Sequence, residues 1–533
     1  MKNIRNTLFS GISRSRRSGW PFLDRKPASS APPCSAEAAG FFRSQFIQEG
    51  IGTDMSDFVF SMKRDGTAVL EGYEGNADRL DIPRTYDGHP VTSIADNAFS
   101  WESRLRSVHI PDTVTTIGEA AFSWCESLTE IDIPSSVRTI GEWAFIGCSS
   151  LRKITLPSGL RKINYSTFQS CTSLTQIEIP DSVKLIGPEA FSECISLQTI
   201  QLPKNLTSLG ESAFSTCEKL EEINLPERLT DLGSNVFSGC VSLSRFIVSD
   251  RHPSFAVSDG VLIDHQKKQL LFYPFQQEPG DYTVPDGIQT ICEEAFSNRT
   301  SLRHITLPES VRVIEHKAFY GCRSLLSITL PDSVTRIDSN AFHGCSAMES
   351  IRLPSGLPVL EYSMFYACQS LQKVILPDHL KIISPCAFSG CSSLNQISFP
   401  DDLLEIGESA FEGCRSLEEI QFPASLESLG NHVFGSCTQL ETVRFSPGMK
   451  VIPARTFSRC LNLSCVDLPS DLEEIESEAF DSCENLLSLQ LPASVTEIAA
   501  DAFSECRHLM LFVYPDSYGE NYAKDFDFPY SEI

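Results

Sequence analysis

Cysteine is the most abundant residue type in this sequence that could do chemistry, with 19 copies in 533 residues. Fifteen recur at 23-residue steps, running from Cys125 to Cys240 and from Cys322 to Cys506. The other four are Cys34, Cys292, Cys386 and Cys465. Zinc sites use closely spaced cysteine pairs, and disulfide frameworks close loops of irregular length. Regular spacing beside apolar residues instead predicts buried free thiols that hold no metal.

The remaining reactive residues form no pattern that predicts catalysis. The sequence has no phosphate-binding glycine loop, nucleophile elbow or HExxH motif, and its ten histidines are scattered. Adjacent acids such as Glu221 and Glu222 point to opposite faces of a strand, so they make a poor acid/base pair. Because an enzyme needs groups that converge in a pocket, we predict a non-enzymatic protein with no catalytic residue, metal or cofactor.

The charge balance restricts the class of partner. Acidic residues outnumber basic residues by 69 to 43, for a net charge of −26. A negative surface repels both phosphate backbones and anionic membranes. No run of about 18 apolar residues occurs, so no membrane-spanning helix is expected. These features predict a protein partner, neither nucleic-acid binding nor membrane insertion, and a monomeric chain.

Phenylalanine marks a repeat of 23 residues, with seven units from Phe99 to Phe237 and ten from Phe296 to Phe503. In the unit at residues 128–151, apolar and acidic residues alternate around Ile131, which predicts a half-buried strand that Pro134 ends. Ala144, Phe145 and Cys148 then have the spacing of a single inward-facing helical turn. One unit is too small to bury its apolar face, so the units must stack.

The unit LxxIxIPxxVxxIGxxAFxxCxx resembles the BspA-like class of bacterial leucine-rich repeats, over roughly residues 58–533. Residues 58–94 resemble the hairpin that opens such domains, and the last twenty residues resemble their closing segment. The resemblance implies an α/β solenoid: a curved leucine-rich-repeat array with a parallel concave sheet, and about 17 repeats in two blocks that a hairpin insertion interrupts.

The pattern divides the chain into six parts. The first 55 residues are rich in Ser, Arg and Pro without periodicity, which predicts a disordered basic segment; Met1 and Met55 both remain candidate starts. The parts are 1–55, the disordered segment; 56–94, a hairpin cap; 95–249, repeat block 1; 250–284, a hairpin insertion; 285–515, repeat block 2; and 516–533, a C-terminal cap.

The insertion has two interpretations. Residues 261–264 and 269–273 alternate like the arms of a hairpin around residues 265–268. We favour a structural joint between the two blocks. The alternative is a binding protrusion that uses Phe272, Tyr273 and Phe275 as aromatic anchors.

The residues that flank the central apolar position of each strand would face outward from the concave sheet. They form a mixed polar surface that is nearly free of aromatic residues. The candidate partner-binding residues are Glu130, Asp132, Lys153, Glu178, Glu222, Arg352, Lys373, Glu419 and Arg444.

Function and location follow from the resemblance and from this surface. Members of the family are commonly surface or secreted proteins that act in adhesion, which implies protein binding through the concave face. No signal peptide or anchor is visible, so the sequence by itself predicts a cytoplasmic protein, and an intracellular scaffold is the alternative. A carbohydrate-binding module is less favoured, because the concave face lacks aromatic platforms.

Overall fold

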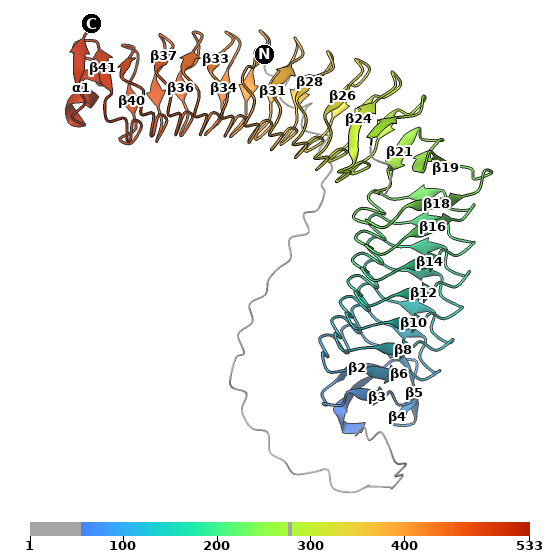
Figure 1. Ribbon diagram of the computed structural model, residues 1–533. Helices are drawn as coiled ribbons and strands as arrows, with labels where there is room; N and C mark the ends of the chain where they lie inside the picture. The colour runs from blue at the N-terminus through green and yellow to red at the C-terminus, as the bar shows by residue number, and fades with distance from the viewer. Residues whose placement is uncertain (1–54, 276–279) are drawn as a thin grey trace, which may run out of the picture. The chain divides into compact units, whose positions relative to one another are not determined.

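The computed structural model describes residues 55–275 and 280–533, which belong to one compact unit, Ile51–Ile533. The segment predicted to be disordered lies outside the described residues, apart from Met55. The described chain coils as a solenoid in which each turn stacks on the one before (Figure 1). This architecture, with its parallel sheets and inserted hairpin, confirms the predicted repeat fold.

Each regular turn contributes two short strands, which form two ladders that we call ladder A and ladder B. Ladder A in block 1 contains β6 (Ser107–His109), β8 (Glu130–Asp132), β10 (Lys153–Thr155), β12 (Gln176–Glu178), β14 (Thr199–Gln201), β16 (Glu222–Leu225) and β18 (Arg245–Val248). Ladder B in block 1 contains β7 (Thr116–Ile117), β9 (Thr139–Ile140), β11 (Lys162–Ile163), β13 (Leu185–Ile186), β15 (Ser208–Leu209) and β17 (Asp231–Leu232).

Block 2 repeats this arrangement. Its ladder A contains β24 (Leu302–Thr306), β26 (Ser327–Thr329), β28 (Ser350–Arg352), β30 (Lys373–Ile375), β33 (Glu419–Gln421), β35 (Thr442–Arg444), β37 (Cys465–Asp467), β39 (Ser488–Gln490) and β41 (Met510–Val513). Its ladder B contains β23 (Thr290–Ile291), β25 (Val313–Ile314), β27 (Arg336–Ile337), β29 (Val359–Leu360), β31 (Ile382–Ile383), β32 (Glu405–Ile406), β34 (Ser428–Leu429), β36 (Val451–Ile452), β38 (Glu474–Ile475) and β40 (Glu497–Ile498).

The register places equivalent residues on top of one another. In ladder A, Ile131 aligns with Ile154 of the next turn, and both are buried. The phenylalanine rings form a column inside the coil, with neighbouring centroids 5.0–6.3 Å apart within each block. Stacking therefore buries the apolar face that no single unit could bury.

The segment around the phenylalanine is not the helical turn that the spacing predicts. Trp143 and Gly147 have positive φ angles of 55° and 70°, which belong to tight turns. The amide of Phe145 donates to the carbonyl oxygen of Thr167 in the next turn of the solenoid, at 2.9 Å. Alternate amides bond to the neighbouring turn of the solenoid, and the amides between them close tight turns within the unit, as Ile146 does on the carbonyl oxygen of Trp143, so no helix forms there. An α-helix is present among the described residues only at α1 (Tyr518–Asp525).

The periodic cysteines have a structural partner. Each of the fifteen thiols donates a hydrogen bond to the carbonyl oxygen of the phenylalanine in the preceding turn, with Sγ···O distances of 2.9–3.4 Å. All fifteen are buried and none forms a disulfide. Each of these carbonyl groups also accepts a backbone amide of its own unit, such as that of Cys148 on Phe145, so the thiol column adds a second, weak donor to it.

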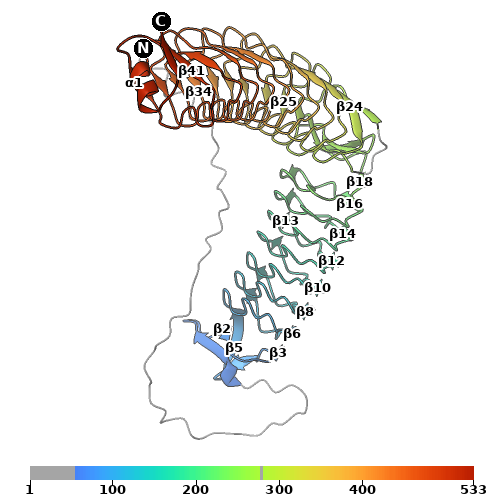
Figure 2. The same cartoon turned by 60° about the vertical axis from the view of Figure 1, so that its left-hand side comes forward.

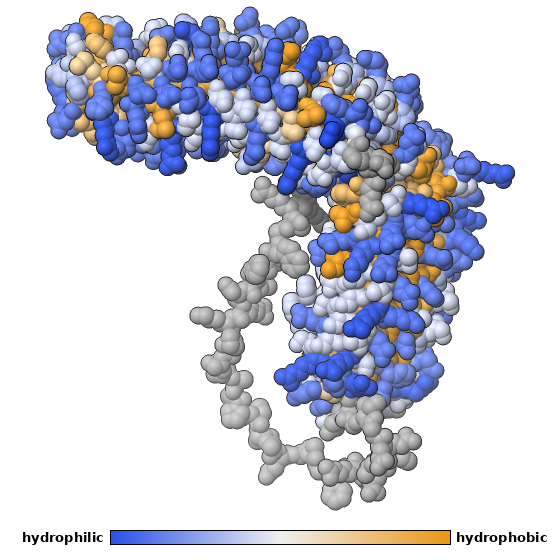
Figure 3. Space-filling model, in the orientation of Figure 1, coloured by the Kyte–Doolittle hydropathy of each residue, from blue (hydrophilic) through white to orange (hydrophobic). Residues whose placement is uncertain are grey.

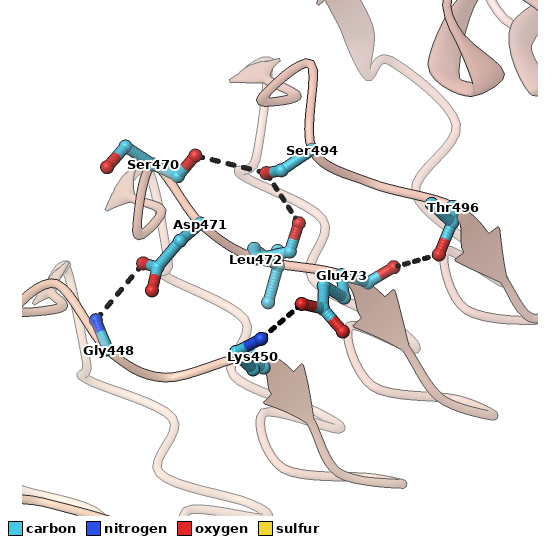
Figure 4. Close-up of polar contacts among 8 residues, drawn as sticks. All are labelled: Gly448, Lys450, Ser470, Asp471, Leu472, Glu473, Ser494 and Thr496. Carbon is cyan, nitrogen blue, oxygen red and sulfur yellow. Dashed lines mark hydrogen bonds and ion pairs between the residues drawn. The ribbon is translucent and has the colours of Figure 1, made fainter.

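Loop residues add further bonds between turns. Near the end of block 2, the Asp471 carboxylate accepts from the amide of Gly448 at 3.0 Å, and the Ser494 hydroxyl donates to the carbonyl oxygen of Leu472 at 2.7 Å (Figure 4). Equivalent serine bonds occur at Ser136 and Ser333. Many of the polar turn residues therefore hold neighbouring turns together.

The insertion forms the predicted hairpin. Strands β20 (Val261–Asp264) and β21 (Gln269–Phe272) pair antiparallel, and β19 (Phe255–Ser258) pairs with β20. β21 then pairs in parallel with β23, the first strand of ladder B in block 2. Strand β22 (Gly280–Thr283) starts ladder A of the same block. The hairpin is consequently part of the sheet, as a structural joint requires.

The two faces of the hairpin belong to different hydrophobic cores. Leu262 and Phe272 pack into the core of block 1, whereas Leu270 and Tyr273 pack into that of block 2. Phe272 and Tyr273 are only 5% and 6% exposed. Phe275 is half-buried beneath the guanidinium of Arg299, which lies 3.6 Å from the centroid of the Phe275 ring. This burial agrees with the favoured interpretation, a structural joint, and argues against the alternative of a binding protrusion that uses Phe272, Tyr273 and Phe275 as anchors.

Both ends of the described unit are capped. The first cap consists of η1 (Met55–Asp57), β1 (Phe58–Met62), β2 (Ala68–Tyr73), β3 (Arg79–Asp81), β4 (Thr85–Tyr86) and β5 (His89–Ile94). β1 and β2 form an antiparallel hairpin, and β2 leads into ladder B through β5. At the other end, α1 packs Tyr522 against Phe503, and β42 (Tyr530–Glu532) completes the sheet beside β41. Figure 2 shows α1 and β41 together at this end of the coil.

Candidate functional site

All nine candidate binding residues lie on ladder A, with their side chains exposed to solvent. Glu130 and Asp132 flank the buried Ile131, and the same exposed–buried–exposed order recurs in β10, β12, β28, β30 and β33. The period of two along each strand and the 23-residue register therefore place them on one surface, which we call the ladder A face. The surface seen in Figure 3 is mainly hydrophilic.

In block 1 the ladder A face carries unneutralised charge. Lys153 aligns with Glu130, and the neighbouring Thr155 lies between Asp132 and Glu178. None of these four charged side chains forms an ion pair with another described residue. The fifth candidate residue in block 1, Glu222, does form an ion pair, with its carboxylate 3.4 Å from the guanidinium of Arg245. The free charges are three acids and one lysine, so this stretch is acidic.

In block 2 the two candidate arginines, Arg352 and Arg444, already form ion pairs within the chain. Arg352 makes a two-pronged contact with Asp332, with both N···O distances at 3.2 Å. The amide of Ser355 and this guanidinium hold the pKa of the Asp332 carboxyl below its ordinary value. Arg444 lies between Glu419 and Asp467, the latter at 3.7 Å. Lys373 has no ion-pair partner in the described chain.

Hollows follow ladder A in block 1. One of about 700 Å³ is lined by β10, β12 and residues of β14, including Lys153 and Glu178. A second of about 920 Å³ extends from β14 to β18 and includes Glu222. A smaller hollow of about 400 Å³ occurs in block 2, where Gln396 forms an isolated bridge with Lys373 and residues 396–398 form no strand. Polar side chains of ladder A in block 1 therefore line recesses in the surface.

Sequence reasoning missed an aromatic cluster on the turns that follow ladder B. Trp101 is 66% exposed and stacks on Trp124, with ring centroids 5.2 Å apart. Trp143 meets Tyr165 edge-on at 5.3 Å. The available signal was tryptophan at the second position after the phenylalanine in two successive units. The role of Asp332 was also missed, because its partner Arg352 is 20 residues away and out of register.

The described residues contain no set of three His, Cys, Asp or Glu side chains placed to hold a metal ion. Burial raises the pKa of Cys125, Cys194 and Cys322 to about 12, so these thiols stay protonated at neutral pH. A search of the described part of the chain finds no helix with the length and apolar character needed to cross a membrane.

Comparisons with known proteins agree with this architecture. The family model for the BspA type leucine rich repeat region matches residues 92–200, 162–257, 273–395 and 381–510. A leucine rich cell surface protein from Faecalibacterium prausnitzii is 31% identical in its crystal structure, with 68% of this chain and 95% of that chain covered and a TM-score of 0.58. A leucine-rich repeat protein from Bacteroides ovatus is 27% identical over 91% of this chain and all of that chain, with a TM-score of 0.45.

No curated protein matches the chain. The family match covers most of the residues of the chain. The chain therefore belongs to the BspA type leucine-rich repeat family.

Proposed function

We propose that this protein is a non-enzymatic scaffold that binds a protein partner through the ladder A face and acts in adhesion at a cell surface. The observation that carries the proposal is the continuous ladder from β6 to β14, which presents aligned, exposed polar side chains beside a recess of about 700 Å³. The similarity to a protein described as a leucine rich cell surface protein supports the location.

The charges predict what the partner looks like. Glu130, Asp132 and Glu178 are exposed without ion-pair partners among the described residues, and Lys153 is the one basic residue among the candidates on this stretch. A complementary partner surface is therefore basic. Such charge complementarity raises the rate of association and fixes the alignment of the two surfaces more than it increases affinity. The surface lacks aromatic anchors, so we expect an interface that distributes weak polar contacts over several turns.

Site-specific photocrosslinking in native cells tests the face. A photoreactive amino acid at Thr155 lies on the ladder A face, and one at Glu218 lies on an exposed turn outside it. We expect a discrete crosslinked species from position 155 and none from position 218. Equal products from both positions, or none from position 155, would contradict binding through ladder A.

A charge-reversal pair provides the matched control. Glu130→Lys, Asp132→Lys and Glu178→Lys together should abolish the crosslink to a basic partner. Glu126→Lys, Glu218→Lys and Glu484→Lys change the net charge equally at exposed turn positions and should preserve it. If both triple variants lose the crosslink, net charge and not the ladder A face is responsible.

Protease treatment of intact cells tests the location separately. We expect the chain to be cleaved while an internal control protein survives until lysis. Complete protection of the chain would overturn adhesion and favour the intracellular scaffold, which could use the same face.

A further inference from the structure

Three of the chain's four tryptophans lie on consecutive turns at the start of block 1, outside ladder A. Trp101, Trp124 and Trp143 belong to the loops that follow β5, β7 and β9. The indole of Trp101 stacks on that of Trp124, with the two ring planes 9° apart. We call this stacked pair the tryptophan platform.

The platform has one covered face and one open face. On the covered side, Trp124 lies so close to the backbone of Gly147 that a Cβ atom at residue 147 would overlap the indole. On the other side, Trp101 is 66% exposed, and Trp124 is the ring that it contacts among the described residues. No described cation lies over the Trp101 ring. A further flat group can therefore stack on Trp101 and extend the column.

The backbone at both tryptophans is unfavourable for so large a side chain. Trp101 and Trp124 have φ angles of 67° and 58°, in the left-handed region that favours glycine. The equivalent position, two residues after the repeat phenylalanine, is glycine with a positive φ in Gly147, Gly239, Gly321, Gly344, Gly390 and Gly413. The fold therefore does not require tryptophan at this position, and the exposed ring of Trp101 gains little burial in return. Backbone strain without a packing benefit indicates a role at the surface.

The charge around the platform selects the kind of group that stacks there. In the three turns at residues 95–105, 118–128 and 141–151, Arg104 is the one basic residue. The acids of the same turns are Asp96, Glu102, Glu119, Glu126 and Glu142. None of these five carboxylates forms an ion pair within the described part of the chain, and the exposed Glu126 and Glu142 are each within two residues of a tryptophan. Unpaired carboxylates beside an open indole favour a cation over a neutral ring.

We propose that the tryptophan platform binds an arginine side chain in a basic segment of a partner protein. The guanidinium stacks on the open face of Trp101, while Glu126 and Glu142 attract the positive charge of the segment. Arginine suits this surface better than lysine, because a guanidinium is flat and weakly hydrated whereas an ammonium is a compact, strongly hydrated charge. The chain shows the same geometry at its joint, where the guanidinium of Arg299 lies 3.6 Å from the centroid of the Phe275 ring.

Fluorescence anisotropy of labelled peptides with the full chain tests the identity of the bound group. The probes are three hexapeptides that alternate serine with arginine, lysine or citrulline. Lysine keeps the charge without the flat group, and citrulline keeps the flat group without the charge. We expect the arginine peptide to bind most tightly, the lysine peptide more weakly and the citrulline peptide not at all, with affinity falling at high salt. Equal binding of the arginine and lysine peptides, binding of the citrulline peptide, or displacement of the arginine peptide by maltohexaose would each overturn the proposal.

Variants locate the binding on the platform. Trp101→Gly should weaken binding of the arginine peptide about threefold to fivefold and preserve the melting temperature, because glycine suits the left-handed backbone. Tyr362→Ala removes an aromatic residue of block 2 that is 51% exposed, and it should leave binding unchanged. Glu126→Gln should weaken binding, whereas Glu218→Gln, at the equivalent exposed position of a unit without tryptophan, should not. An equal effect of either variant and its control would contradict binding at the platform.

The ladder A variant distinguishes this proposal from the proposed function. Glu130→Lys, Asp132→Lys and Glu178→Lys together alter the ladder A face and should leave the preference for the arginine peptide over the lysine peptide unchanged. Loss of that preference would place the arginine site on ladder A. Loss of the photocrosslink from position 155 would leave the platform unaffected, so the two proposals can fail separately.

The chain's own arginines are the remaining alternative occupant. Arg14, Arg16 and Arg17 lie outside the described residues, in the basic N-terminal segment. Arg14→Gln, Arg16→Gln and Arg17→Gln together, in the full chain, should leave the affinity for the arginine peptide unchanged. Tighter binding of the peptide by this variant would assign the platform to the chain's own segment and overturn the assignment to a partner.

Discussion

The ring of Phe411, in the middle of the block 2 column, offers a direct test of the stacking argument. It is fully buried, with its centroid 5.2 Å from that of Phe388 and 5.4 Å from that of Phe434. Phe399 meets it edge-on at 5.7 Å. Phe411→Ala removes all three ring contacts and leaves a cavity between turns that cannot close without shifting both neighbours.

The expected cost of Phe411→Ala is about 3–5 kcal/mol, the range for a buried phenylalanine truncated to alanine. Leu487→Ala is the control, because Leu487 is 58% exposed; it should change stability by no more than about 0.5 kcal/mol. In a linear repeat array the loss concentrates in neighbouring turns, so unfolding of Phe411→Ala is expected to split into two steps.

Hydrogen exchange read by mass spectrometry measures this effect locally. A loss of 3–5 kcal/mol corresponds to amide exchange faster by roughly two to three and a half orders of magnitude, since each 1.4 kcal/mol is tenfold. Peptides spanning residues 388–434 should show it, and peptides from block 1 should not. A change below about 1 kcal/mol in those peptides would refute the buried column.

Three further predictions concern thiols and the joint. Among the cysteines that the structure describes, native thiol labelling with peptide mapping should modify Cys465 first and Cys386 and Cys292 more slowly, whereas modification of any of the fifteen column thiols before unfolding would contradict their burial. Folded thiols whose pKa is raised above the unfolded value of about 9, such as Cys125 at about 12 and Cys506 at about 11, stabilise the fold fully below pH 9. This contribution is lost as the pH rises toward the pKa values of the folded thiols, so the urea midpoint of unfolding should be lower at pH 10.5 than at pH 8. An equal midpoint at both pH values would argue against raised thiol pKa values. Arg299, at the cysteine position of the first unit in block 2, donates through Nε to the carbonyl oxygen of Tyr273 at 2.5 Å. Arg299→Val should therefore cost about 1–3 kcal/mol more than Arg299→Cys, which restores a thiol donor, and equal urea midpoints for the two variants would disprove this role.

The repeat period predicted the architecture because it specifies which residues stack on one another in successive turns. A 23-residue step places Phe on Phe and Ile on Ile, and only a stacked coil buries such columns. The hairpin at residues 261–272 was also predictable, since both arms alternate around a short polar loop. The prediction of a helical turn around Phe145 was wrong, because spacing within one unit does not reveal that alternate amides bond to the next turn.

The candidate face was predictable in outline but not in its charge. Alternation along each strand identifies Glu130 and Lys153 as outward residues, and the structure places both on ladder A. Alternation does not reveal that Arg352 is held by Asp332, a loop residue, or that Arg444 lies between two acids. Those pairings depend on how loops fold back over the strands.

The sequence by itself determined the period, the columns of Phe, Cys and Ile, and the polar character of the outward positions, because these follow from spacing and side-chain type. Only the tertiary structure decided which charges are neutralised and that Phe272 and Tyr273 are divided between two cores. It also decided that a recess lined by Glu293, Glu294 and Glu315 lies where the period is interrupted. The physical reason is that the period specifies contacts between equivalent residues, whereas these features arise between residues that the period does not relate.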